Sequence, residues 1–143
     1  MSAFADTSRE TTTAAVITEP VPDLQLQLLI QLLDRELRSS LPLTLTLSGG
    51  VLHGDLIGHE EWKAEWARSL RQVEGEGANL LAEFPESVDQ GLSEFGAEED
   101  PGLPRWIHLR DVTLSVGGVS PVLLPLWRGR LADVSGWALG RPQ

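Results

Sequence analysis

The feature that most constrains the fold is a set of three short apolar blocks with glycines at fixed places. The blocks are residues 43–62 (LTLTLSGGVLHGDLIGHEEW), 106–116 (WIHLRDVTLSV) and 126–140 (LWRGRLADVSGWALG). Each block mixes apolar residues and glycines in a strand-like pattern, and none holds a recognisable set of catalytic residues. Glycines inside strands mark bulges or sharp bends. The blocks therefore predict an α+β fold with a small, strongly bent antiparallel sheet or partly open barrel of about five strands.

The first block predicts a β-hairpin. Residues 43–47 alternate leucine and threonine, which is the period-two pattern of a strand with one buried face. Residues 48–50 (SGG) supply the positive φ angles of a tight turn. The returning strand covers residues 51–57, and Gly54 within it predicts a bulge or bend.

The second block predicts a strand with a break in its alternation. Ile107 and Leu109 share one face, whereas Val112 and the apolar residues after it have the opposite parity. Such a change of phase predicts a bulge near residues 110–111.

The end of the chain predicts a turn and two more strands. Residues 117–125 contain glycines and prolines and are expected to form the turn. The strands are expected at residues 126–131 and 134–139, joined around residues 132–133.

A helix is expected to precede the sheet, over residues 23–39, with Asp23 accepting hydrogen bonds from its first turn. Its main apolar stripe comprises Leu26, Leu29, Ile30, Leu33 and Leu37. Three further leucines, Leu24, Leu28 and Leu32, widen the stripe beyond what one small sheet would cover. Either the helix is buried on two sides of its own domain, or part of the stripe meets another subunit or an apolar partner.

A second helix is expected over residues 59–71. Glu60 and Glu61 lie in its first turn, where negative charge is favourable. Trp62 and Trp66 recur four residues apart on one face. This spacing is typical of core residues, and the alternative is an aromatic binding face.

The charge of −10 is concentrated in one segment. No lysine or arginine occurs between Arg71 and Arg105, and residues 74–104 are expected to be a mobile acidic insert with short, poorly packed helices or none. The insert lies within a single domain, residues 23–140, after a disordered arm, residues 1–22. The nine acidic residues of the insert are Glu74, Glu76, Glu83, Glu86, Asp89, Glu94, Glu98, Glu99 and Asp100.

The same charge and composition bear on partners and location. A polyanion would be repelled at long range by the insert, so no nucleic-acid partner is expected. The sequence has no cysteine and no apolar run long enough to span a bilayer. A cytoplasmic protein without membrane contact is therefore expected.

Few residues have catalytic or metal-binding chemistry. His53, Asp55, His59 and Glu60 form the one group with metal-ligand side chains, and surface or helix-start roles are the preferred interpretation. His108 is expected to be a structural or surface histidine. We predict no catalytic residues, no metal and no cofactor.

Arginines are concentrated in the C-terminal sheet. Arg128 and Arg130 share one strand face, with Trp127 on the other. Together with Arg105 and Arg110 they could pair with the acidic insert, lie on a solvated face or contact nucleic acid. Pairing would make association sensitive to salt.

Taken in order, these blocks resemble the gas vesicle accessory protein GvpU family. The resemblance covers about residues 24–140, and its C-terminal block, W-R-G-x-[IL]-A-x-V-x-G-[FW]-x-L-G, is the most specific part. The matching residues are Gly54, Leu56, Ile57, Ile107, His108, Leu109, Trp127, Arg128, Gly129, Ala132, Val134, Gly136, Leu139 and Gly140.

The resemblance implies a non-enzymatic accessory protein that acts by protein–protein binding in gas vesicle assembly, organisation or clustering. The expected partners are further copies of the chain and gas vesicle shell or other gas vesicle proteins, with a location in the cytoplasm at the vesicle surface. The alternative is a small-barrel, Sm-like nucleic-acid-binding module. Candidate interaction residues are Leu26, Leu29, Leu33, Trp62, Trp66, Arg110, Trp127, Arg128 and Arg130.

Overall fold

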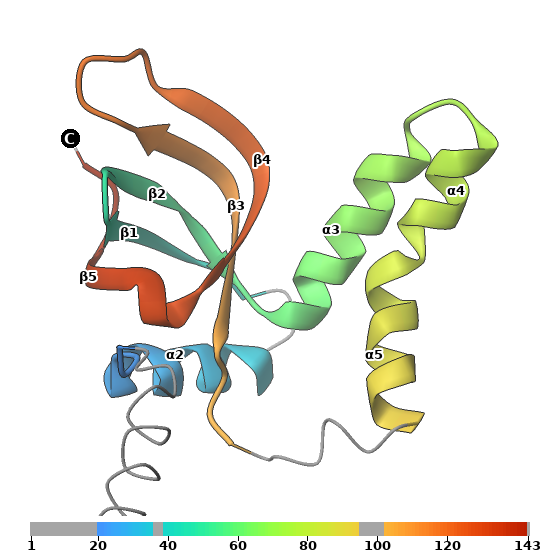
Figure 1. Ribbon diagram of the computed structural model, residues 1–143, viewed down its shortest axis with the longest axis horizontal. Helices are drawn as coiled ribbons and strands as arrows, with labels where there is room; N and C mark the ends of the chain where they lie inside the picture. Colours follow the sequence, from blue (N-terminus) through green and yellow to red (C-terminus); the bar gives the residue numbers. More distant parts are fainter. Residues whose placement is uncertain (1–19, 36–38, 95–101, 143) are drawn as a thin grey trace, which may run out of the picture.

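The computed structural model describes residues 20–35, 39–94 and 102–142. Most of the expected N-terminal arm, residues 1–19, lies outside this part of the chain. The described elements, in chain order, are α2 (Leu24–Arg35), β1 (Leu41–Leu47), β2 (Gly50–Ile57), α3 (His59–Arg71), α4 (Glu76–Ala82), α5 (Phe84–Glu94), β3 (Trp106–Ser115), β4 (Val122–Arg130), the 3₁₀ turn η1 (Leu131–Asp133) and β5 (Val134–Leu139) (Figure 1).

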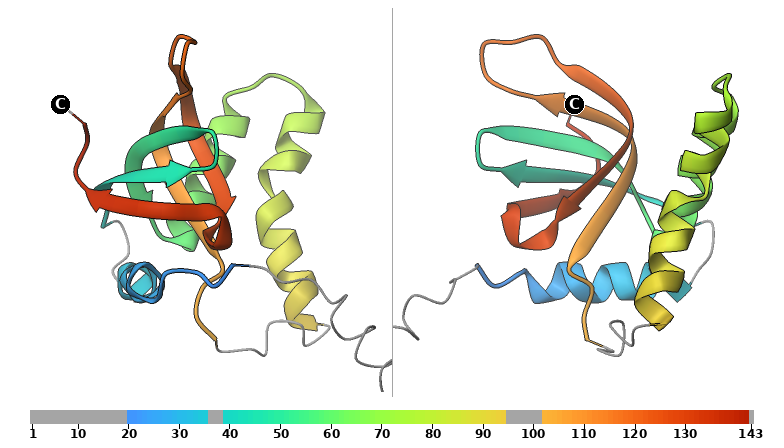
Figure 2. Two further views of the ribbon diagram at one scale, coloured as in Figure 1. Left: turned by 60° about the vertical axis from the view of Figure 1, so that its left-hand side comes forward. Right: turned by 45° about the vertical axis from the view of Figure 1, so that its right-hand side comes forward.

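The strands form one antiparallel sheet with the order β4-β3-β2-β1-β5. The sheet is strongly bent and does not close (Figure 2). This confirms the expected α+β fold with five strands. The last two strands are consecutive in sequence but lie at opposite edges of the sheet, because η1 carries the chain from β4 across to the free side of β1.

A bulge bends the sheet where the sequence predicted one. The β2–β3 register shifts between His53 and Asp55, and Asp111 on the facing strand has a positive φ of 52°. Gly54 lies between them, and a Cβ atom built there would be 2.9 Å from the carbonyl oxygen of Arg110. The glycine and the change of phase are therefore two sides of one bulge.

The core fills the concave side of the sheet, and α2 lies across one end of it (Figures 1 and 2). Leu26 and Ile30 of α2 enter this core. Asp23 caps the helix as predicted, since its Oδ1 accepts a hydrogen bond of 2.9 Å from the amide of Leu26. The other core residues are Leu43, Leu45, Leu52, Leu56, Ile107, Leu109, Val112 and Leu131.

The acidic segment contains two helices, α4 and α5, which run back alongside α3 and form an arm that projects from the sheet (Figure 1). The indole Nε1 of Trp66 donates a 2.7 Å hydrogen bond to the carbonyl oxygen of Leu81. Arg71 and Glu83 form an ion pair of 2.7 Å. The arm is thus attached to α3 by a helix-to-helix hydrogen bond and by charge.

One predicted boundary was wrong. The expected turn at residues 117–125 is shorter, because β4 already begins at Val122 and includes Pro125. Proline is tolerated there because β4 is an edge strand that needs no amide donor on its free side. The first helix ends at Arg35 in the described chain, and residues 36–38 of its expected range lie outside it.

Candidate interaction site

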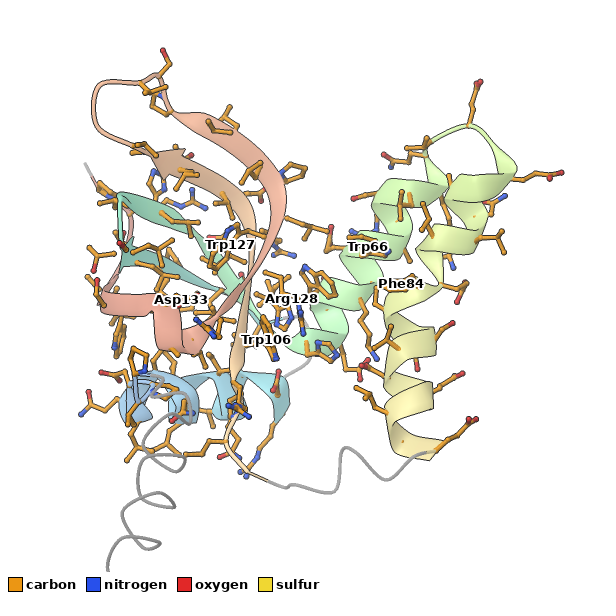
Figure 3. The ribbon with its side chains drawn as sticks, in the orientation of Figure 1. Trp66, Phe84, Trp106, Trp127, Arg128 and Asp133 are labelled. Atoms are coloured by element: carbon orange, nitrogen blue, oxygen red, sulfur yellow. The ribbon has the colours of Figure 1, made fainter. Side chains whose placement is uncertain are left out.

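A cavity of about 270 Å³ lies where helices α2, α3 and α5 meet strands β3 and β4. Its lining combines apolar, aromatic and charged side chains from segments far apart in the sequence. Arg128 projects from β4 toward α3 and lies next to Trp106 (Figure 3). The lining residues are Ile30, Asp34, His59, Asp89, Leu92, Pro104, Arg105, Trp106, His108 and Arg128.

The guanidinium of Arg128 lies over two indole rings. Its Cζ is 4.0 Å from the ring centroid of Trp106 and 5.9 Å from that of Trp62. Both distances are within the range of a cation–π interaction. Partial burial lowers the pKa of Arg128 from its ordinary value, against the opposing charge of Asp89. The side chain as a whole is nevertheless exposed, so the charged guanidinium is accessible from solvent.

His108 lies beneath this arginine and is 4 % exposed. Its Nε2 accepts a 3.2 Å hydrogen bond from Arg128 Nε. Burial lowers the pKa of His108 from 6.5 to about 3, and the neighbouring charges of His59 and Arg128 act in the same direction. The imidazole is consequently neutral near neutral pH, and the proton is on Nδ1 when Nε2 accepts from the arginine.

Lys63 forms a second charged cluster beside the cavity. The side chain is 9 % exposed, and its Nζ lies 2.6 Å from Glu86, 2.8 Å from Asp89 and 3.0 Å from Glu60. Hydrogen bonds to these carboxylates raise the pKa of Lys63 although burial opposes them. The lysine therefore keeps its charge and connects α3 to α5.

Asp89 and Asp34, the two acidic residues in the cavity lining, already have partners. Asp89 Oδ2 is 2.9 Å from His59 Nε2 in addition to its contact with Lys63, and hydrogen bonds to both lower its pKa against the opposing effect of burial. Asp34 Oδ1 accepts a 3.1 Å hydrogen bond from the amide of His59. Helix α2 thereby supplies the N-terminal cap that Gly58, at the start of α3, cannot supply.

A different surface lies on the outer side of α2. Leu24, Leu28 and Leu32 are 57 %, 47 % and 59 % exposed and recur every fourth residue, so they form one line on the helix. Val21, just before the helix, is 91 % exposed. We call these four residues the α2 leucine face. The three leucines are the residues that the sequence marked as an excess of apolar surface on this helix.

The predicted interaction residues lie in different environments. Leu26 is fully buried in the core, and Leu29 and Leu33 are partly buried against it. Trp62 is 8 % exposed, with its Nε1 buried and without a partner among the described residues. Trp66 is partly buried.

The arginines do not act as one group. Arg110 faces α3, with Glu61 and Glu65 at 3.5 Å and 3.7 Å, and Arg130 pairs with Asp133 at 2.9 Å. Arg128 forms the cavity contacts described above. In the described pairs, the carboxylates of the acidic segment bind cations of α3 and not these sheet arginines.

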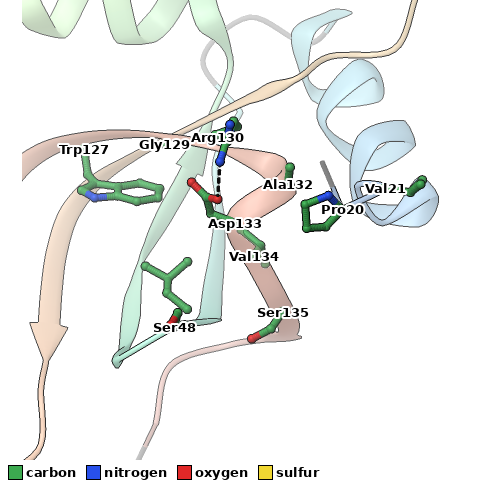
Figure 4. Close-up of a pocket in the computed structure, with 11 residues that line it drawn as sticks. Pro20, Val21, Ser48, Trp127, Gly129, Arg130, Ala132, Asp133, Val134 and Ser135 are labelled. Carbon is green, nitrogen blue, oxygen red and sulfur yellow. Dashed lines mark hydrogen bonds and ion pairs between the residues drawn. The ribbon is translucent and has the colours of Figure 1, made fainter. Parts of the chain in front are cut away.

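Trp127 lies on the other side of β4 and lines a wider groove of about 660 Å³ between β4 and β5 (Figure 4). Its ring occupies the space beside Gly129, where an added Cβ would be 2.1 Å from the indole. The Arg130–Asp133 ion pair closes part of the same groove (Figure 4). Any side chain larger than a hydrogen atom at Gly129 would displace this indole.

Three of the four side chains considered for a metal have other partners: Asp55 pairs with Arg141 at 2.8 Å, His59 with Asp89, and Glu60 with Lys63. The Nδ1 of the fourth, His53, is buried without a hydrogen-bond partner among the described residues. Across residues 20–35, 39–94 and 102–142, no group of three or more suitable side chains is placed to hold a metal ion. Within the same ranges, no helix has the length and apolar character needed to cross a membrane.

The fold and these surfaces define a class: a small α+β protein with an open, bent sheet, an apolar helix face and a cationic–aromatic cavity. A protein-family model described as "Gas vesicle protein GvpU-like" matches residues 23–142. The chain therefore belongs to the GvpU-like family of gas vesicle proteins, as its motifs predicted. A comparison with curated proteins found no match.

Proposed function

We propose that this protein is a non-enzymatic accessory protein that binds gas vesicle proteins and acts in the assembly, organisation or clustering of the vesicles. Membership of the family supplies the gas vesicle context. The α2 leucine face is the observation that carries the binding role. An exposed apolar line of this length on one helix is typical of a protein contact.

The charge around α2 favours an apolar contact. Between Pro20 and Leu33, Asp23 is the one charged residue, and its carboxylate is used to cap the helix. A partner would therefore lose little hydration of charged groups when it covers the helix. We place a gas vesicle protein on this face, at the vesicle surface in the cytoplasm.

Self-association of the chain has its own support. Both outer strands, β4 and β5, have an edge with no paired strand among the described residues. Leu123 on β4 and Leu139 on β5 are 76 % and 66 % exposed. Exposed edges with apolar side chains favour pairing with another chain. The acidic helices α4 and α5 would then limit clustering through charge repulsion.

The test is co-flotation of the full-length protein with purified gas vesicles, comparing wild type with Leu28→Gln/Leu32→Gln. Each leucine is already about half covered, so its complete burial contributes roughly 1 kcal/mol. Loss of both should weaken binding about 30-fold. The matched control is Leu80→Gln/Leu81→Gln, which changes two exposed leucines on α4 and should bind like wild type.

Two results would refute the proposal. One is equal flotation of the α2 variant and wild type. The other is retention of RNA by the wild-type protein at low salt without any binding to vesicles, which would favour the Sm-like nucleic-acid module. The Arg128–Trp106 pair resembles a stacking platform for bases. The RNA assay therefore compares the vesicle-binding proposal directly with the nucleic-acid alternative.

A further inference from the structure

The geometry points to Arg128 as a receptor for a carboxylate carried by a protein partner. This inference rests on the proposed protein-binding function and names a chemical contact within it. The site is the cavity between α2, α3, α5 and the β3–β4 pair, whose lining includes Ile30 and Asp34 of α2 but no residue of the α2 leucine face.

Arg128 is an exposed cation without a carboxylate partner among the described residues, and its guanidinium lies over the rings of Trp106 and Trp62. Its polar contact is the hydrogen bond from Nε to His108, and no carboxylate among the described residues lies within ion-pair distance of it. Six other cations do form ion pairs with carboxylates: Lys63, Arg68, Arg71, Arg110, Arg130 and Arg141. An exposed guanidinium without an ion-pair partner is accessible to an anion from solution, and charge-assisted hydrogen bonds to it are strong.

The surrounding side chains leave one direction for that anion. Trp106 and Trp62 lie within cation–π distance of the guanidinium, and His108 occupies the Nε–H. The Nη atoms, at the far edge of the planar group, remain as donors. Since Arg128 lines the cavity, an anion in the cavity can reach this edge. A guanidinium edge binds a carboxylate through two parallel hydrogen bonds.

The acids nearby would not compete for Arg128. Asp89 is bound to Lys63 and His59, so it acts on Arg128 through its charge but forms no ion pair with it, and Asp34 Oδ1 accepts a hydrogen bond from the amide of His59. Neutral His108 adds no charge of its own to the site, and it holds the guanidinium in position. The site is therefore arranged before any partner arrives, which reduces the entropic cost of binding.

A protein carboxylate fits this setting better than a phosphate chain. The acidic helix α5 borders the cavity and would repel a polyanion, whereas a single carboxylate on an apolar partner experiences little of that repulsion. Two sources of such a group exist. One is a gas vesicle protein, and the other is a second copy of this chain, in which Glu74, Glu76 and Glu94 have no ion pair among the described residues.

The direct test is an NMR titration of the full-length protein with sodium acetate, with sodium chloride at equal ionic strength as the control. Acetate should shift the Arg128 Nε–H and Trp106 indole signals saturably, and chloride should not. Arg128→Gln should abolish the response of Trp106. An equal response to chloride, or no response, would overturn the inference. A stronger response to phosphate than to acetate would also overturn it, in favour of a phosphorylated ligand.

The source of the carboxylate is identified by measuring vesicle flotation and self-association of Arg128→Gln. The control is Arg141→Gln, which removes the same charge. A loss of about tenfold or more in vesicle flotation assigns it to a gas vesicle protein, and the same loss in self-association by sedimentation assigns it to a second copy. The control should match wild type in both assays. If Arg128→Gln matches wild type in both assays, the inference is wrong while the proposed function stands. If wild type binds neither vesicles nor itself, the proposed function fails, and the acetate titration still decides on the site.

Discussion

Lowering the pH from about 7 to about 5 should destabilise the protein through His108. The pKa of this histidine is about 3 in the folded protein and 6.5 as its ordinary value. Below pH 6.5 this histidine is therefore protonated in the unfolded chain but stays neutral in the folded protein. The free energy of unfolding consequently falls as the pH falls, and the loss is complete only near the folded pKa.

For this pair of pKa values the expected loss between the two pH values is about 2 kcal/mol. Asp89 does not contribute in this window, because its lowered pKa places its titration below the ordinary carboxylate range. The groups that face His108 are His59 and Trp62 from α3, Arg128 from β4 and Asp89 from α5. His59 and Arg128 add to the lowering, and Asp89 opposes it.

The assay is urea unfolding at the two pH values, followed by tryptophan fluorescence, with His108→Gln as the comparison. Glutamine accepts the hydrogen bond from Arg128 Nε but does not titrate. The pH-dependent loss should therefore be about 2 kcal/mol smaller in the variant than in wild type. Equal pH dependence of the two proteins would refute the claim that His108 is buried in its neutral form.

Two further substitutions test the bulge at Gly54 and the ion pairs of Lys63. Gly54→Ala should lower the free energy of unfolding by about 1–3 kcal/mol, because the new Cβ meets the carbonyl of Arg110, at 2.9 Å. Gly77→Ala, where a Cβ meets nothing within 4 Å, is the control in thermal unfolding and should be neutral or slightly stabilising. Lys63→Met should destabilise by about 2 kcal/mol, since three partly exposed carboxylates lose their common cation. Urea unfolding should show a smaller loss at high salt, and a loss independent of salt would contradict the electrostatic explanation.

The local features of the fold could be predicted because they depend on neighbours in the sequence. The hairpin at residues 48–50, the Asp23 cap and the helix at residues 59–71 all follow from short patterns. The bulge was predicted twice, from Gly54 and from the change of phase at residues 110–111. The structure then places both halves opposite each other.

The pairing of strands could not be predicted in the same way. The 3₁₀ turn at residues 131–133 sends β5 to the far edge of the sheet, and nothing in its local sequence selects β1 as its partner. Pro125 suggested a turn because proline cannot donate to a neighbouring strand, a constraint that is absent at an edge. Strand order depends on contacts between distant segments, which a periodic pattern does not contain.

The residues that meet at the cavity also could not be predicted from the sequence. Lys63 and Asp89 are 2.8 Å apart in space but belong to different helices, and the helix of Asp89 lies in a segment expected to pack poorly. No motif joins them to His108 or Arg128, and the sequence left open whether the sheet arginines pair with the acidic segment, face solvent or contact nucleic acid. The signal that existed was weak: Arg128 and His108 both belong to the motifs shared with the family, but a shared motif gives no distance between residues.

Helix α2 connects the fold to the proposed function because one of its faces packs on the core and the other is exposed. Leu26 and Ile30 fill the end of the bent sheet, and that face alone would anchor the helix. The leucines on the outer face add no contact to this core and remain about half exposed. Replacing them with polar residues would therefore cost the isolated domain little stability, whereas a partner would lose most of its apolar contact. Under the proposed function, a second protein covers this apolar surface along the helix.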